Sequence, residues 1–183
     1  MLLHCTKKLA AKLPADVFGK LAPRSVSVQG EPSSLGAWHG HLLILDRRPC
    51  LLFCHDLTRY VLFLPCLRMS QVGELGRLHR ELFLATLAAE GVPAAYLDRL
   101  ERIWGPLRGD TKTDRSVLAS LRVAADDLQY GSLPRVANVL DLDPMTTSRR
   151  LNERPCRVRT LLIWPAQAML ALIDEEMRAS TTT

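Results

Sequence analysis

The chain has 183 residues, of which 48% are hydrophobic and 23% charged, and its formal net charge at pH 7 is +5. This is the composition of a globular protein with enough length for a sizeable core, so we expect one domain over residues 1–180 and a disordered tail at 181–183. The longest apolar runs are strand-length, well short of the roughly 18 residues of a membrane-spanning helix, which argues against an integral membrane protein.

Two further features favour a cytoplasmic location. The opening stretch, MLLHCTKKLAAKLP, places apolar residues before lysines, the reverse of the order in a secretory signal. The five cysteines are an odd number and lack the spacing of an extracellular disulfide framework, so we expect reduced thiols.

The first part of the chain has the pattern of a small sheet. We expect a short strand at residues 2–5, an amphipathic helix from Lys7 that Pro14 ends, and an irregular connection over residues 14–36. Three closely spaced apolar runs then predict the strands of an antiparallel meander, at about residues 38–46, 50–55 and 59–65.

Beyond Ser70 the apolar spacing becomes helical. It predicts helices from Ser70 to Gly91, from Pro93 to Gly105 and, with Asp114 as the capping residue, from there to Gly131. The remainder predicts three shorter helical pieces: LPRVANVL, PMTTSRRLNERP and WPAQAMLALIDEEMRAS. The expected fold class is therefore α+β, with an antiparallel β-meander of three to five strands in the N-terminal half packed against a set of helices from the C-terminal half.

Histidines and cysteines are concentrated in the stretch HGHLLILDRRPCLLFCHD. If DRRP forms the turn with Asp46 opposite Pro49, His41 faces Cys54 on one side of the hairpin. The further ligands available for a tetrahedral zinc site would be His39, His4 and Cys5. A CxxC pair is absent, and the same side carries leucines, so we favour a hydrophobic core and expect no metal and no cofactor.

Catalytic groups are harder to identify. Cys5 precedes Lys7 and Lys8 at a predicted helix start, which would favour a reactive thiolate, but a buried structural thiol is the preferred interpretation. The carboxylate pairs have no obvious convergent partner; they are Asp126 and Asp127, Asp141 and Asp143, and Glu175 and Glu176. Whether the protein is an enzyme stays open.

Basic residues provide the strongest binding signal. The loop GDTKTDRS leads into a helix N-terminus, which suits an anion, although simple capping by Asp114 explains the same pattern and no Walker motif is present. The stretch TTSRRLNERPCRVR offers hydroxyls and five arginines for phosphates and base edges, or else a solvated helix face. The candidate anion-binding or nucleic-acid-binding residues are Lys7, Lys8, Arg47, Arg48, Lys112, Arg115, Arg149 and Arg150.

Four motifs resemble a family of uncharacterised bacterial proteins, a domain of unknown function that opens with a Cys-Thr-Lys-Lys motif. They are CTKKL, LGAWHGHLLILDRRPCLLFCHDLTRY, KTDRSVLASL and RRLNERP. The resemblance spans most of the chain and implies no established activity or catalytic residue. Asp46, Arg47 and Arg48 fall at positions of the family pattern, which favours a function at the turn of the hairpin over one in the thiols.

Three functional hypotheses follow from these observations. The leading one is a small nucleic-acid-binding or regulatory protein of a bacterial toxin–antitoxin, mobile-element or defence locus. The second is an enzyme that acts on a nucleotide or phosphorylated substrate at residues 110–116, with Lys7, Lys8 and Arg47 converging from the sheet. The third is a module that binds and masks a partner protein.

Overall fold

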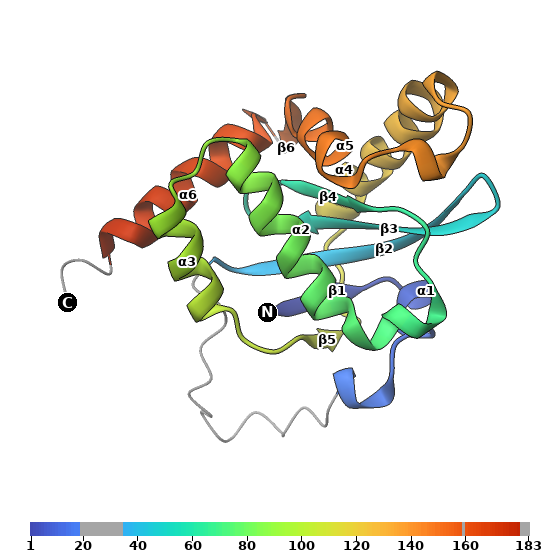
Figure 1. Ribbon diagram of the computed structural model, residues 1–183, viewed down its shortest axis with the longest axis horizontal. Helices are drawn as coiled ribbons and strands as arrows, with labels where there is room; N and C mark the ends of the chain where they lie inside the picture. Colours follow the sequence, from blue (N-terminus) through green and yellow to red (C-terminus); the bar gives the residue numbers. More distant parts are fainter. Residues whose placement is uncertain (19–34, 159, 180–183) are drawn as a thin grey trace.

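A computed structural model describes residues 1–18, 35–158 and 160–179 (Figure 1). The protein is α+β, as expected, and is built on a five-stranded sheet with the strand order β4-β3-β2-β1-β5. The strands are β1 (Leu2–Cys5), β2 (Ala37–Leu45), β3 (Arg48–His55), β4 (Val61–Leu64) and β5 (Arg108–Asp110). The predicted meander is present as β2, β3 and β4, which pair antiparallel, whereas β1 is parallel to both β2 and β5.

The helices surround this sheet. They are α1 (Lys7–Ala10), α2 (Leu75–Ala89), α3 (Ala94–Ile103), α4 (Arg115–Asp126), α5 (Pro144–Asn152) and α6 (Pro165–Ala179). Short 3-10 turns occur at Ala15–Phe18, Met69–Glu74, Leu133–Arg135 and Val139–Asp141, and a π-helical turn at Asp127–Ser132 continues α4. A separate hairpin joins β6 (Cys156–Val158) to β7 (Leu161–Ile163).

Two hydrophobic cores lie on opposite faces of the sheet. Strand side chains alternate between faces, so Leu51 and Phe53 point to one side and Leu52 and Cys54 to the other. The first side packs on Phe83 and other residues of α2, α3 and α6, and the second packs on residues of α4 and α5. The sheet is therefore a central layer between two groups of helices (Figure 1).

The hairpin register differs from the predicted one. Leu45 pairs with Arg48 and Ile44 with Pro49, so the turn contains only Asp46 and Arg47 rather than the four residues of DRRP. Pro49 has no N–H group to donate. The Ile44–Pro49 pair requires no hydrogen bond from Pro49 to β2, and the carbonyl of Pro49 accepts from Leu67 N at 2.8 Å.

The shift by two residues keeps every side chain on its predicted face but changes the partners. His39 faces Cys54, and His41 faces Leu52, so the expected His41–Cys54 pair is wrong.

The helical predictions hold best where the apolar stripe is long. The third helix begins as expected, with Asp114 Oδ1 accepting from the N–H groups of Ser116 and Val117. The stretch LPRVANVL forms two 3-10 turns instead of a helix, and the β6–β7 hairpin was not predicted. The predicted disordered tail at residues 181–183 and most of the irregular connection lie outside the described residues. Within the described residues, no helix is both long and apolar enough to cross a membrane.

Candidate functional site

Two histidines and two aspartates meet at the end of the sheet where β1 and β5 stop. His4 and Asp110 occupy paired positions on these neighbouring parallel strands, and His39 is paired with His4 across to β2. Asp56 follows β3 directly, in the turn that leads to β4. We call these four residues the His–Asp cluster.

His39 is held at both ring nitrogens. It is 1% exposed, and its Nε2 accepts from the backbone N–H of Asp114 at 2.8 Å. The ring proton therefore lies on Nδ1, which donates to Asp56 Oδ1 at 2.6 Å. Because neither nitrogen is left for a ligand, His39 connects the sheet to the start of α4 and acts as a structural group.

His4 is the more accessible histidine of the cluster. Its Nδ1 is 2.6 Å from Asp110 Oδ1, while its Nε2 is 3.6 Å from Asp56 Oδ2. The side chain is 16% exposed. A carboxylate that accepts from one nitrogen fixes the ring orientation, and the second nitrogen is then available to exchange a proton.

The start of α4 closes the cluster on one side. The hydroxyl of Ser116 donates to Asp114 Oδ1, and this bond, together with the backbone N–H of Ser116, holds the pKa of Asp114 below its ordinary value. Arg59 Nη2 donates to Ser116 Oγ at 2.8 Å, and Arg59 Nη1 donates to the backbone oxygen of Asp56. The β3–β4 turn and α4 are thereby joined through a buried guanidinium.

Four of the eight predicted basic residues belong to this end of the molecule. Parallel pairing of β1 with β5 sends both strands out of the sheet at the same edge. Lys7 and Lys8 follow β1, Lys112 follows β5, and Arg115 begins α4. All four side chains are exposed. We call Lys7, Lys8, Lys112 and Arg115 the basic edge.

One further basic residue extends the basic edge along α4. Burial lowers the pKa of His41, and the positive charges of Lys8 and Arg122 lower it further. These three groups therefore lie within electrostatic reach of one another. Arg122 was not among the residues selected from the sequence.

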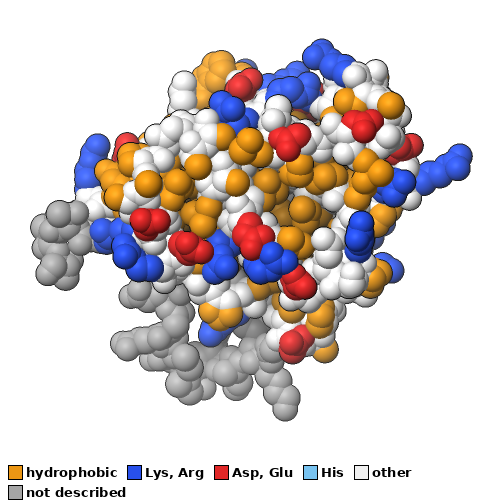
Figure 2. Space-filling view, viewed as in Figure 1, with side chains coloured by type: hydrophobic (Ala, Val, Ile, Leu, Met, Phe, Trp, Pro, Cys, Tyr) orange, Lys and Arg blue, Asp and Glu red, His pale blue; other side chains and the backbone are white. Residues whose placement is uncertain are grey.

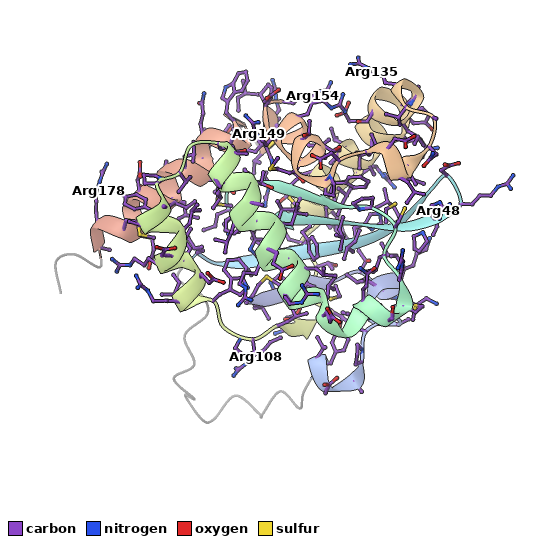
Figure 3. All side chains as sticks on the ribbon, viewed as in Figure 1. Arg48, Arg108, Arg135, Arg149, Arg154 and Arg178 are labelled. Atoms are coloured by element: carbon purple, nitrogen blue, oxygen red, sulfur yellow. The ribbon has the colours of Figure 1, made fainter. Side chains whose placement is uncertain are left out.

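The other four predicted residues lie elsewhere. Arg47 and Arg48 are exposed at the β2–β3 hairpin. Strand β2 continues for five residues beyond Gly40, which is its last residue paired with β1. At 3.3 Å per residue this extension is about 17 Å long. Arg47 therefore does not converge with Lys7 and Lys8 in the way the enzyme hypothesis expected. Figure 3 shows Arg48 at the hairpin, well separated from Arg149 on α5.

Arg149 and Arg150 are half-buried, and their charges act on groups inside the protein. Arg150 Nη2 lies 3.2 Å from Asp127 Oδ2 and also donates to Ser132. Burial raises the pKa of Glu90, and a hydrogen bond from Tyr60 and the nearby charge of Arg149 oppose that effect. The two arginines thus serve intramolecular contacts beside β4, three strands away from β1.

The thiols have the properties of core residues. Cys5, Cys50 and Cys54 are fully buried, and all five cysteines are free. Burial raises the pKa of Cys5 to about 12 and that of Cys50 to about 11. Neither thiol is a thiolate at neutral pH, which agrees with the preferred structural interpretation. Among the described residues, no group of three or more His, Cys, Asp or Glu side chains has the geometry of a metal site.

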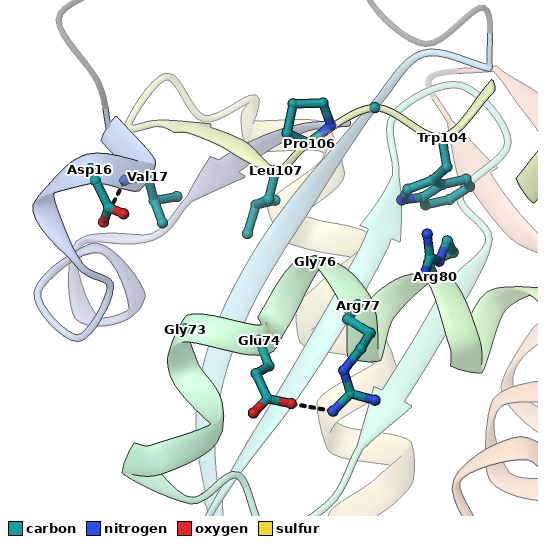
Figure 4. A pocket seen from close by; sticks show the side chains of 11 residues that line it. Asp16, Val17, Gly73, Glu74, Gly76, Arg77, Arg80, Trp104, Pro106 and Leu107 are labelled. Carbon is teal, nitrogen blue, oxygen red and sulfur yellow. Dashed lines mark hydrogen bonds and ion pairs between the residues drawn. The ribbon is translucent and has the colours of Figure 1, made fainter. Parts of the chain in front are cut away.

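Two of the cavities in the described part of the chain lie near the features above. The larger one, about 540 Å³, lies between the start of α2 and the segment from Trp104 to Leu107. Figure 4 shows Trp104 beside Arg80 at one end and Asp16 with Val17 at the other. Its charged groups largely neutralise each other, because Arg77 pairs with Glu74 and with Glu81.

The smaller cavity, about 320 Å³, lies between α4, the end of α5 and β6, and its wall includes the buried Arg59. On the molecular side shown in Figure 2, Lys and Arg side chains are interspersed with Asp, Glu and hydrophobic groups. The charge pattern on that side is mixed and does not resemble a continuous basic surface.

These features define an α+β protein with a mixed sheet between two helical layers and a His–Asp cluster at one sheet end. Residues 2–168 match the model of the family described as "Domain of unknown function (DUF6933)", and the chain belongs to this family. No curated protein and no solved structure matched the chain. The resemblance to a family of unknown function is therefore confirmed, and the family assigns no activity to the cluster.

Sequence reasoning found His4 and His39 as neighbours but considered them only as zinc ligands. It missed Asp56, Asp110 and Arg59. A usable signal was present for Asp56, which directly follows a predicted strand, where side chains from neighbouring strands converge. Asp110 ends β5, a strand that was not predicted. Asp110 is adjacent to His4 only in the folded sheet, so a comparison of carboxylates that are adjacent in sequence does not reveal it.

Proposed function

We propose that the protein binds nucleic acid through the basic edge. The observation that carries the proposal is the parallel pairing of β1 with β5, which brings Lys7, Lys8 and Lys112 to one end of the sheet. Arg115 adds a fourth exposed cation in the first turn of α4. Because most protein–nucleic acid contacts go to phosphates, exposed cations that pair with no carboxylate of the described segments suit this role.

The other four predicted basic residues contribute to the proposed binding of nucleic acid to different extents. Arg47 and Arg48 project on the hairpin and are accessible to a long ligand that also lies on the basic edge. Arg149 and Arg150 contribute least, because their charges already face Glu90 and Asp127. We therefore assign phosphate contacts first to the basic edge, then to the hairpin.

Salt-dependent binding tests the proposal. The protein is titrated with duplex and single-stranded DNA and RNA at several salt concentrations. The logarithm of the affinity should fall with the logarithm of salt by about 0.9 for each phosphate contact on a duplex. The quadruple variant Lys7→Gln, Lys8→Gln, Lys112→Gln, Arg115→Gln should bind more weakly and with a slope smaller by about 3 to 4.

A matched variant separates specific placement from total charge. Replacing Arg99, Arg102, Arg135 and Arg178 with Gln removes four cations away from the basic edge. This control variant should retain most of the affinity for nucleic acid and most of the slope of its salt dependence. No binding near 50 mM salt, or equal losses in the two quadruple variants, would contradict the proposal.

The His4–Asp110 contact favours a second candidate function, an enzyme that acts on a phosphorylated or nucleotide substrate. His4 would take a proton at Nε2 from an attacking water or hydroxyl while Asp110 holds the ring at Nδ1. The attacking oxygen bonds to phosphorus as the P–O bond to the leaving group breaks, and His4 then returns the proton to the departing oxygen. The basic edge would hold the phosphate beside it. Proton transfer of this type contributes roughly 10²- to 10⁴-fold to a rate.

Hydrolysis of p-nitrophenyl phosphate, bis(p-nitrophenyl) phosphate and RNA tests this second candidate. His4→Gln should abolish turnover while nucleic-acid binding persists, and His41→Gln provides a histidine control outside the cluster. Full activity in His4→Gln, or no turnover of any substrate by the unaltered protein, would remove the enzyme from consideration.

The proposal also includes a cellular setting. Five free thiols, three of them fully buried, favour a reducing compartment, and the bacterial cytoplasm is our proposed location. A nucleic-acid-binding role there fits a toxin–antitoxin, mobile-element or defence locus. Cell fractionation with an antibody against the protein checks the location.

A further inference from the structure

The smaller cavity contains an arginine whose binding capacity is only partly used. Arg59 is 6% exposed and lines the cavity together with residues of α4, α5 and β6. Its two outer nitrogens donate to Asp56 and Ser116. Its Nε is buried and has no hydrogen-bond partner. A buried charge is costly unless an opposite charge meets it, and Arg59 forms no ion pair with a carboxylate of the described residues.

The charges around Arg59 do not balance within the cavity. Arg154 and Arg157 also line the wall, and the one acidic group there is Asp127. Asp127 pairs with Arg154 and with Arg150, which lies outside the wall. Among the described residues of its wall the cavity therefore has an excess of positive charge, and Arg59 is the deeply buried cation of that set.

The rest of the wall is mainly apolar. Val61 and Leu151 form its buried part, while Ala119 and Val123 of α4 form its rim. At about 320 Å³ the space is at the small end of the range for ligand pockets, which runs from roughly 300 to 1,000 Å³. An apolar wall with a few convergent polar groups is the usual composition of such a pocket.

We propose that this cavity is a binding site for a small organic oxyanion, a carboxylate or a phosphate monoester attached to a compact apolar body. The negative charge of the oxyanion is attracted by the guanidinium groups of Arg59 and Arg157 in the cavity wall, and the outer nitrogens of Arg59 stay on Asp56 and Ser116. The apolar body lies against Leu151 and Val123. The cavity is distinct from the basic edge, because none of the four residues of the basic edge lines it.

Isothermal titration with simple probes tests the site. Phenyl phosphate and benzoate represent the two oxyanions on one apolar body, and benzyl alcohol is the uncharged comparison. We expect saturable binding of at least one anion and none of benzyl alcohol at the same concentration. The anion that binds more tightly identifies the ligand chemistry. Absence of binding by both anions at 10 mM would overturn the proposal.

Two variants locate the bound probe. Arg59→Met removes the anchor and should weaken anion binding about tenfold or more. Because Arg59 also holds the β3–β4 turn, Ala119→Phe provides an independent check, since it fills the cavity from an exposed position of α4. Ala119→Phe should abolish binding without lowering the melting temperature.

Controls separate this site from other surfaces. Ala88→Phe places the same bulk on an exposed position of α2 and should leave the affinity unchanged. The Lys7→Gln, Lys8→Gln variant tests whether the probe sits on the basic edge, and it too should bind normally. Unaltered binding in Ala119→Phe would show that the cavity is not the site, whatever the fate of the nucleic-acid proposal.

Discussion

Asp46 and Arg47 form the hairpin turn with φ angles of 48° and 61°, so both are in the left-handed region. This conformation matches the twist of a two-residue hairpin and normally selects Asn or Asp followed by Gly. Arginine in the second position has a Cβ that approaches the following carbonyl, which costs roughly 1–2 kcal/mol. The exposed turn is thus strained at one residue.

Arg47→Gly should relieve this strain. We expect the free energy of unfolding to rise by about 0.5–1 kcal/mol, because glycine removes the steric cost but adds freedom to the unfolded chain. Urea denaturation of both proteins measures the difference. The neighbouring Arg48→Gly, in an extended strand, should instead lower stability by about 0.5–1 kcal/mol. Destabilisation by both changes would contradict the strain argument.

The turn also shows why the register was mispredicted. The faces of Leu43, Cys50 and Leu52 follow from strand alternation, which is a property of the sequence pattern. The turn length depends on the backbone conformations of two residues. Asp-Arg is a weaker sequence signal for a two-residue turn than Asn-Gly. The prediction was therefore right about the faces and wrong by two residues about the partners.

Helix α5 protects an edge of the sheet. β4 is the last strand in the order and exposes backbone groups that β3 does not use. Asn152 of α5 supplies both partners for Val61, since its Oδ1 accepts from the N–H at 2.7 Å and its Nδ2 donates to the carbonyl at 2.8 Å. Ser148, one turn earlier, accepts from Phe63 N at 2.9 Å. One helix face thus replaces a neighbouring strand.

Asn152→Ala should leave both backbone groups of Val61 buried without partners. Each such loss costs about 1–3 kcal/mol, so we expect a total destabilisation of about 2–5 kcal/mol in urea denaturation. Asn138→Ala is the matched control. Asn138 caps an exposed 3-10 turn by accepting from Leu140 N, and its loss should cost about 1 kcal/mol. Equal effects would show that the edge contact is unimportant.

At the level of elements, the sequence predicted those with a long periodic pattern. Helices α2, α3, α4 and α6 have enough apolar positions to reveal a stripe. The β6–β7 hairpin has only three residues in each strand, and Leu161 and Leu162 are both exposed, so no alternation exists to be detected. The parallel placement of β1 and β5 is set by tertiary packing that local pattern does not contain.

The whole molecule encloses two neutral imidazoles between the sheet and α2. His79 is fully buried among Trp38, Phe53 and Phe83, and neither ring nitrogen has a partner. His55 accepts from Thr58 N and contacts the carbonyl of Leu35. Burial lowers the pKa of His79 to about 3 and that of His55 to about 4.

This interior predicts a loss of stability in mild acid. The unfolded chain protonates both histidines near pH 6.5, whereas the folded protein keeps them neutral to about pH 4, so the unfolded state binds more protons between these values. Lowering the pH from 8 to 5 should cost about 2 kcal/mol for each histidine. Urea denaturation at the two pH values measures it.

His79→Leu identifies the source of the acid sensitivity. It removes one titrating group and two unpaired nitrogens at similar volume, so we expect about 2 kcal/mol less loss at pH 5 and no loss of stability at pH 8. Phe83→Leu, a core change without titration, should destabilise equally at both values. An unchanged pH dependence in His79→Leu would contradict the burial argument.

The candidate site was only partly predictable at this scale. Lys7, Lys8, Lys112 and Arg115 were selected from local charge, and the fold places them at one sheet end. Asp56, Asp110 and Arg59 look unremarkable in sequence, and their importance comes from contacts between distant segments. The sequence pattern therefore indicated cations, while the carboxylates that surround His4 became visible only in the folded protein.

The position of β1 between β2 and β5 has a consequence for protein synthesis. His4 and Asp110 are separated by 106 positions, although they contact each other in the folded chain. At roughly 5–20 residues per second, β1 leaves the ribosome on the order of 5–20 seconds before β5. The meander β2–β4 is complete much earlier. A truncated translation product that ends before β5 therefore contains the meander but lacks Asp110, so a complete His–Asp cluster shows that synthesis has passed β5.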